Sequence, residues 1–336
     1  MDAQPTNDNV TAESHKWRIK KHRDRSRICQ WISFILLRML TGFIQILPLR
    51  LAVFFVKSMA SLVYYIDFLH SRRAVAHVLY SGICTTPKEA RALARASFIS
   101  VGMTFVEIVK ARQLINKDNF REYFTLEASD ETIKRHFAGE DGENAIIVSA
   151  HVGNWELAGM AYCLFSGKKL VSIMRPLNNQ LIGDYFYSHR ESDMHTTVAK
   201  DSGLLSLFKS LLSGQSIAVV ADQHASSREG VEISFMGKRA RAHKSPSLLS
   251  IRGRRPILCG ALIRLDEQMH FKLVVSDPID FKPSGDLEAD VKSLTQLYSD
   301  KLAEIIQRYP EQWLWSHRRW LDCNRANRVH KHHKNP

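Results

Sequence analysis

The sequence predicts an α/β protein, in which apolar membrane-associating helices precede a mixed, mostly parallel sheet flanked by helices. From residue 144 onward, short apolar runs of strand length alternate with helical patterns, which is typical of a parallel sheet covered on both faces. Residues 28–69 are strongly apolar, which predicts the helical layer. The chain has 336 residues, 45% of them hydrophobic, and this is enough for one sizeable core.

The composition divides the chain into four regions. We expect a basic polar extension over residues 1–27, a membrane-associated helical segment over 28–70, an α/β domain over 71–322 and a basic tail over 323–336. A bilayer-spanning helix needs roughly 20 largely uncharged residues, and Arg38 interrupts the best window here. We therefore favour helices that lie in the membrane face. A single tilted span and a buried hairpin of a soluble domain are the alternatives.

The periodicity of apolar residues predicts the elements in order. Residues 87–114 have the spacing of one long amphipathic helix, interpreted as scaffold. Further helices are expected at 154–165, 179–191, 203–212 and 286–309. Strands are expected at 145–150, 169–174, 216–222, 231–237, 256–265 and 270–277.

The charge of the chain indicates an anionic partner. The net charge is +13 and the isoelectric point is near 9.6, which suits nucleic acid, an acidic protein or an anionic membrane. Nucleic acid is disfavoured, because the sequence has no zinc-finger spacing, no basic region with heptads and no aromatic RNA-binding motif. The five scattered cysteines form no C-x-x-C pair, so they argue against a disulfide framework and suit a reducing compartment.

The strongest candidate site is His151, which follows the apolar run at 145–150. The ends of such strands are where active sites of α/β sheets gather. Glu156 lies five residues later, and a turn at Gly153 would let the carboxylate meet the imidazole and fix its tautomer. His151 would then act as general base on an acceptor hydroxyl, because no G-x-S-x-G elbow or suitable Cys supplies a nucleophile. H-x-x-x-x-E is not a zinc-hydrolase spacing, so a metal is disfavoured. A purely structural His is the alternative.

Five sequence blocks resemble the lipid A late acyltransferases, the lauroyl and myristoyl transferases, which are related to the glycerolipid acyltransferases. The blocks are HVGNWE (151–156), MRPLNNQLIGDYFYSHRE (174–191), SIAVVADQHA (216–225), VEISFMGKRA (231–240) and YPEQWLWSHRRW (309–320). They occur in the family's order and cover most of the chain from residue 146 to residue 320. The resemblance implies a glycerolipid-acyltransferase-like sheet and a His151/Glu156 dyad as general base.

The resemblance also implies roles for further residues. The positions that match the family's substrate-binding or catalytic residues are Arg175, Asn179, Arg190, Asp222 and Gln223. Arg318 and Arg319 would either hold a phosphate or pack structurally. The nearby Trp313, Trp315 and Trp320 are expected to be packing residues or membrane-interface anchors.

The implied activity is transfer of a fatty acyl chain from acyl carrier protein to a hydroxyl of a lipid A precursor, as a secondary acylation. No metal and no cofactor are expected beyond the phosphopantetheine that the donor carries. The implied partners are acyl carrier protein, an anionic lipid and the membrane surface, with no nucleic acid, at the cytoplasmic side of a bacterial inner membrane. One alternative is an acyltransferase for a lysophospholipid or another glycolipid, such as a glycosylated phosphoinositide. A catalytically silent membrane-binding protein is the other.

Overall fold

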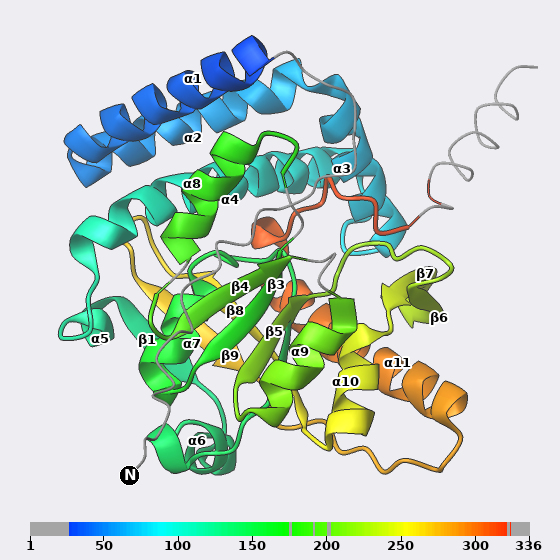
Figure 1. The fold of residues 1–336 in the computed structure, drawn as a ribbon. Helices are drawn as coiled ribbons and strands as arrows, with labels where there is room; N and C mark the ends of the chain where they lie inside the picture. Colours follow the sequence, from blue (N-terminus) through cyan, green and yellow to red (C-terminus); the bar gives the residue numbers. More distant parts are fainter. Residues whose placement is uncertain (1–26, 175–176, 191, 200–202, 321–322, 324–336) are drawn as a thin grey trace, which may run out of the picture.

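A seven-stranded mixed sheet forms the centre of the computed structural model, which describes residues 27–174, 177–190, 192–199, 203–320 and 323 (Figure 1). The strand order is β1-β9-β8-β2-β5-β3-β4. The strands are β1 (Phe124–Glu127), β2 (Ile146–Ser149), β3 (Leu170–Met174), β4 (His195–Ala199), β5 (Ser216–Val220), β8 (Ile257–Arg264) and β9 (Phe271–Val275). The five strands from β8 to β4 are parallel to one another, whereas β9 is antiparallel to β8 and parallel to β1. The predicted mostly parallel sheet is confirmed.

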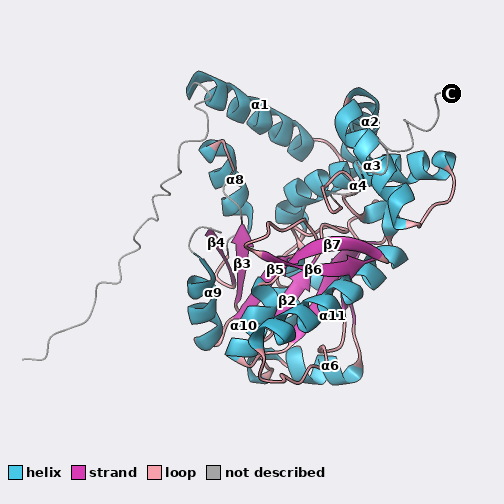
Figure 2. Ribbon diagram, turned by 90° about the vertical axis from the view of Figure 1, so that its right-hand side faces the viewer, coloured by secondary structure: helices cyan, strands magenta, loops and turns pink. Residues whose placement is uncertain are grey.

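Helices cover both faces of the sheet and bury a separate apolar cluster on each. One cluster includes α7 (Ala158–Ser166), and the other includes α9 (Gly203–Leu212), α10 (Ser245–Gly253) and α11 (Leu287–Arg308). A two-stranded hairpin, β6 (Gly230–Phe235) and β7 (Lys238–His243), packs beside α11 (Figure 2). The remaining short elements are α5 (Phe120–Tyr123), α6 (Asp130–His136), η1 (Gly139–Asp141), α8 (Gln180–Arg190) and η3 (Pro310–Gln312).

The N-terminal helices form a layer above the sheet. They are α1 (Arg27–Ile46), α2 (Leu49–Ile66), α3 (Phe68–Ser81) and α4 (Pro87–Leu114). A capping box between Thr86 and Glu89, with Pro87 in the first turn, fixes the start of α4. Lys110 of α4 donates from Nζ to the carbonyl oxygens of Gln45 and Leu47, at 2.9 and 2.7 Å, and so caps the end of α1.

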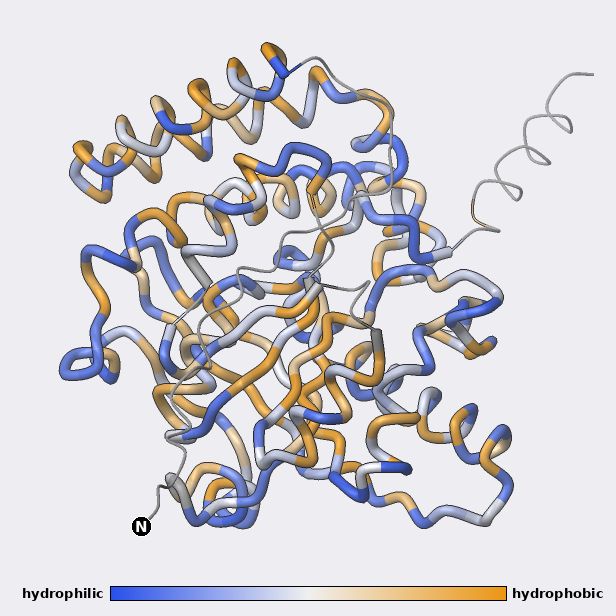
Figure 3. The backbone as a smooth tube through the Cα atoms, in the orientation of Figure 1, coloured by the Kyte–Doolittle hydropathy of each residue, from blue (hydrophilic) through white to orange (hydrophobic). Residues whose placement is uncertain are grey.

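Hydrophobic residues recur along the helices of this layer (Figure 3), and many of their side chains on α1 and α2 are exposed. Within the described residues, α1, α2 and α4 are long and apolar enough to cross a membrane. Half of the apolar window of α4 is buried in the protein, but only 11% of that of α1 and 22% of that of α2. Exposed apolar faces on α1 and α2 indicate membrane association. How deeply these helices enter the bilayer stays a prediction, as does the four-region division of the chain.

The structure differs from the expected elements in a few places. The helix expected at 154–165 begins at Ala158, and the Asn154 backbone N–H donates to the Leu262 oxygen at 2.7 Å. Strands β1 and β4 were not expected. β4 reads HTTVA and lies at the sheet edge, where polar residues weaken the apolar signal of a strand. The residues before α1 and the tail after 323 lie outside the described residues.

His77 of α3 links the helical layer to the C-terminal segment. Its side chain is 1% exposed, and Nδ1 donates to the Trp315 carbonyl oxygen at 3.1 Å. Nε2 is buried without a hydrogen-bond partner. Burial lowers the pKa of His77 from 6.5 to about 4, since the interior disfavours a charged ring.

Candidate active site

The register of two parallel strands brings His151 and Asp222 together. Ser149 of β2 pairs with Val220 of β5, and each strand is followed two residues later by a polar side chain, His151 or Asp222. Parallel strands present their carboxyl ends at the same edge of a sheet, so the two side chains converge there.

Three short hydrogen bonds hold the Asp222 carboxylate. His151 Nδ1 lies 2.7 Å from Oδ1, while the His151 backbone N–H and Trp313 Nε1 both donate to Oδ2, at 2.9 and 2.7 Å. Burial opposes ionisation of Asp222, but attraction to His151 and these hydrogen bonds outweigh it and hold the pKa of Asp222 well below its usual range. The carboxylate is therefore ionised, and Nδ1 carries the proton that it accepts. In the neutral ring this arrangement leaves the lone pair on Nε2, the nitrogen that a general base would use.

The Nε2 side of His151 faces Gln223 and His317. The Gln223 amide nitrogen lies 3.4 Å from His151 Nε2 and 2.9 Å from His317 Nδ1, so one amide group donates to both rings. The two imidazole rings are 4.7 Å apart. Burial and the neighbouring His151 lower the pKa of His317 to about 4, which keeps this second ring neutral at physiological pH. A substrate hydroxyl that displaced the Gln223 amide would meet the lone pair of His151.

Glu156 lies beside this centre, in a different contact. Its Oε1 accepts a hydrogen bond from Trp155 Nε1 at 3.0 Å, and the Trp155 ring packs against the His151 ring at 5.2 Å. The carboxylate that the structure places on His151 Nδ1 is that of Asp222. Orientation of His151 by Glu156 therefore stays a prediction, and Asp222 holds the position that Glu156 was expected to fill.

Glu156 lines a narrow pocket of about 70 Å³ that runs between α7 and the sheet. We call it the interior pocket, and its walls include Ser149, Trp155, Gly159 and Ala218. The lining is mostly apolar, and it includes Ser149 and Trp155, which flank the His151 turn in the sequence. Its apolar walls could contact a short part of a hydrocarbon chain, although the volume is well below that of most ligand sites.

The structure places the other predicted residues differently. Asn179 caps α8, because its Oδ1 accepts the backbone N–H of Leu181 at 3.1 Å, and its Nδ2 donates to the Gln30 oxygen of α1 at 2.9 Å. Arg190 ends α8, and Arg175 lies outside the described residues. No position relative to His151 is therefore assigned to either guanidinium.

The two C-terminal arginines have opposite environments. Arg318 is exposed, whereas Arg319 is 1% exposed. Arg319 lies over the Phe235 ring at 4.0 Å and donates to the Gln223 carbonyl oxygen at 3.3 Å. Burial lowers the pKa of Arg319 to about 10. Arg319 thus packs structurally behind the site, while Arg318 is accessible to an anion.

A buried ionic network holds the loop between β2 and α7. Arg264 of β8 pairs with Glu107 of α4 through Nε and through Nη2, the latter at 2.9 Å, and Asn154 Nδ2 donates to the same carboxylate at 2.8 Å. Gly153 has φ of +63°, and a Cβ at this position would lie 2.0 Å from the Leu262 carbonyl oxygen, so only glycine fits. The scaffold helix α4 thereby positions the residues next to His151.

Sequence reasoning missed several of these contributors. Glu107 and Arg264 are 157 residues apart and Trp313 is 91 residues from Asp222, so no local pattern connects them. A charged residue inside the otherwise apolar run at 105–109 was the one available signal for Glu107. Among the described residues, no group of three or more His, Cys, Asp and Glu side chains could hold a metal ion.

Comparison with known proteins shows the family of the chain. Residues 18–322 match the model of the bacterial lipid A biosynthesis acyltransferase family. The chain is 24% identical over 238 residues to the lipid A biosynthesis palmitoleoyltransferase of Escherichia coli K12, covering 69% of this chain and 72% of that protein, and it matches a Shigella flexneri lipid A biosynthesis acyltransferase equally well. It is also 23% identical over 193 residues to a phosphatidylinositol mannoside acyltransferase of Mycobacterium tuberculosis, covering 56% of this chain and 58% of that one. The protein therefore belongs to the bacterial lipid A biosynthesis acyltransferase family and is an O-acyltransferase.

Proposed function

We propose that this protein transfers a fatty acyl chain from an acyl carrier protein thioester to a hydroxyl of a lipid A precursor, as a secondary acylation. The observation that carries the proposal is the His151–Asp222 pair, in which Asp222 holds Nδ1 of His151 and Nε2 is on the side of Gln223 and His317. The relatives act in lipid A biosynthesis by name, which supports this acceptor class. Asp222 is the orienting carboxylate in this proposal, and Glu156 lines the path of the donor chain.

The chemistry needs no covalent enzyme intermediate. The acceptor hydroxyl displaces the Gln223 amide and gives its proton to His151 Nε2 while its oxygen attacks the thioester carbonyl carbon. Asp222 stabilises the imidazolium that forms, since its carboxylate lies 2.7 Å from Nδ1. When the C–S bond breaks, His151 returns the proton to the departing thiolate. The products are the ester and the free thiol of the carrier.

The proposed partners fit the charge of the chain. A net charge of +13 favours approach of an acidic carrier protein and of an anionic lipid surface. Exposed apolar side chains on α1 and α2, such as Phe54 and Ile46, would sit in the lipid. We place the catalytic domain at the cytoplasmic face of the inner membrane, because acyl carrier protein is a cytoplasmic donor.

An acceptor panel tests the proposal. Purified wild-type protein is given labelled acyl groups on acyl carrier protein, with lipid A precursor, lysophospholipid or phosphatidylinositol mannoside as acceptor. Transfer to the lipid A precursor supports the proposal. Preferred transfer to phosphatidylinositol mannoside, the acceptor named for the mycobacterial relative, would replace the acceptor and keep the chemistry. Intact-protein mass spectrometry during turnover should detect no acyl adduct, and a covalent acyl-enzyme would overturn direct transfer.

A further inference from the structure

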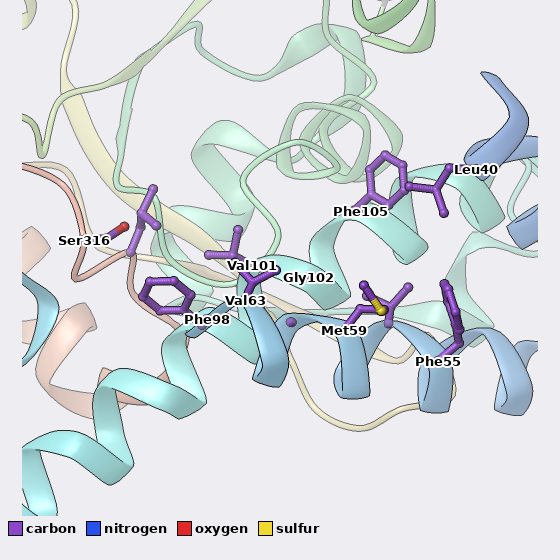
Figure 4. A pocket seen from close by; sticks show the side chains of 12 residues that line it. Leu40, Phe55, Met59, Val63, Phe98, Val101, Gly102, Phe105 and Ser316 are labelled. Atoms are coloured by element: carbon purple, nitrogen blue, oxygen red, sulfur yellow. The ribbon is translucent and has the colours of Figure 1, made fainter. Parts of the chain in front are cut away.

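An elongated apolar cavity of about 440 Å³ lies between α1, α2, α4 and the segment after η3. We call it the membrane-side cavity, and the residues that matter here are Leu40, Phe55, Met59, Val63, Leu314 and Ser316. Figure 4 shows the labelled side chains spread from Ser316 at one end to Leu40 and Phe55 at the other. Its volume is within the range of ligand sites, and its shape and lining fit an extended hydrocarbon chain.

One end of this cavity adjoins the reactive histidine. Leu314, a wall residue, donates its backbone N–H to the His151 carbonyl oxygen at 3.0 Å. His317 follows Ser316 directly, and its ring contacts the His151 ring. A chain lying in the cavity would therefore have one end within reach of the imidazole.

The same end carries positive charge. Arg73 of α3 donates from Nη1 to the Ser316 carbonyl oxygen at 3.2 Å, and Arg318 is exposed two residues further on. Burial and the charge of Arg318 lower the pKa of Arg73. The charge of the Asp67 carboxylate has the opposite effect and raises the pKa of Arg73. An anionic head group at this end would relieve the repulsion between the arginines.

The cavity opens toward the bilayer side of the molecule along α2, where Met59 and Val63 line it and are 43% and 44% exposed. Leu40 of α1 and Phe55 of α2 form the wall next to exposed apolar side chains of the same helices. A hydrocarbon chain that entered between α1 and α2 would cover these side chains and gain the free energy of apolar burial.

We propose that the membrane-side cavity binds the acyl chain of the lipid acceptor that carries the reacting hydroxyl, with its anionic head group near Arg73 and Arg318. The inference rests on the proposed function, since secondary acylation takes place on a hydroxyl of an acyl chain. That hydroxyl must reach His151 Nε2 while the rest of its chain stays out of water. The interior pocket then holds the donor chain, and the two chains meet at His151 from opposite sides.

A matched set of three substitutions on α2 tests this assignment. Val63→Trp and Met59→Trp narrow the membrane-side cavity. Leu62→Trp introduces the same side chain outside the cavity, at a residue of similar exposure, 50%. With full-length protein in detergent, we expect Val63→Trp and Met59→Trp to lower kcat/KM for lipid A precursor at least tenfold, mainly through KM. Leu62→Trp should stay within twofold of wild type. The preference among donor chain lengths should not shift in any variant.

Two outcomes would overturn the inference. Equal loss in all three variants would show a general effect of bulk on α2. A shift in donor chain-length preference would show that the cavity holds the donor chain.

A binding measurement separates this inference from the proposed function, because it needs no turnover. Lipid A precursor with a diazirine at the end of the acyl chain that bears the hydroxyl is photolysed with the protein, and the labelled peptide is identified by mass spectrometry. Label within residues 55–63 or 98–105 supports the assignment even if wild type proves inactive as a transferase. Label on the interior-pocket segments 158–162 or 218–220 contradicts it.

Discussion

Replacing Asp222 with Asn should remove catalysis and leave the fold in place. Both the His151 backbone N–H and Trp313 Nε1 donate to the same oxygen, Oδ2. One amide oxygen can therefore satisfy both donors in Asp222→Asn. The amide nitrogen must then occupy the position of Oδ1, 2.7 Å from His151 Nδ1, where it donates. Nδ1 becomes the acceptor, the ring proton moves to Nε2, and His151 presents the wrong tautomer for a base.

The size of the effect follows from that tautomer change. In a hydrolase triad the equivalent change lowers kcat by about 10⁴-fold, so a loss of roughly 10³ to 10⁴ is expected here. Loss of the charged hydrogen bond should cost about 1–3 kcal/mol of unfolding free energy, since the site stays hydrogen-bonded. KM for either substrate should change little.

The assay combines single-turnover acyl transfer, thermal unfolding and ¹⁵N shifts of the histidine ring nitrogens. We expect a folded protein, a shifted His151 tautomer and loss of transfer. The control is Asp118→Asn, which makes the same replacement at an exposed residue that is far in sequence from this strand edge, and it should behave like wild type. An Asp222→Asn protein that keeps kcat within tenfold of wild type would refute the reasoning. If Glu156→Gln alone removed transfer, Glu156 would be the orienting group.

Three further substitutions probe the surroundings of the site. Glu107→Ala leaves the buried Arg264 guanidinium without its carboxylate and should lower the free energy of unfolding by about 3–5 kcal/mol, measured by chemical denaturation. Glu304→Ala removes a carboxylate from an exposed ion pair and should lower it by less than about 1 kcal/mol. Similar losses in the two variants would contradict the buried network. Gly153→Ala should lower the rate of transfer at least tenfold, because the added Cβ would collide with backbone atoms of a neighbouring strand. Gly237 also has a positive φ, +70°, but no atom lies within 4 Å of an added Cβ, so Gly237→Ala should keep its activity. Equal losses in the two variants would mean that the strain of a positive φ alone is responsible. The third prediction concerns pH. His77 of the unfolded chain binds a proton near pH 6.5, whereas the folded protein binds it only near pH 4. The free energy of unfolding should therefore decrease as the pH falls from 6.5 to 4, by up to roughly 3 kcal/mol. His77→Gln should flatten this part of the pH–stability curve, and an unchanged slope would exclude His77 as its source.

The sheet could be predicted from the sequence because its central strands are buried on both faces. Strands β2, β5 and β8 are continuous apolar runs, and the residues expected there cover the observed ranges. β4 was missed because an edge strand can remain polar, and the four residues of β1 are too few for a period to show.

The site was predictable only in part, for a different physical reason. A histidine at the end of a buried strand indicates where the chemistry occurs, so His151 could be singled out from local pattern. Which carboxylate meets Nδ1 depends on the register between β2 and β5, and Asp222 lies 71 residues from His151. The shorter separation favoured Glu156, but the turn at Gly153 and the tie of Asn154 to Leu262 direct that segment toward β8. Local spacing carries no information about such contacts.

The most direct test of the central claim compares wild type with His151→Ala in transfer of a labelled acyl chain from acyl carrier protein to lipid A precursor, with both proteins checked for folding. We expect robust transfer by wild type and a loss of at least about 10²-fold in His151→Ala, since a positioned general base contributes at least that much. Transfer by His151→Ala at the wild-type rate would contradict it.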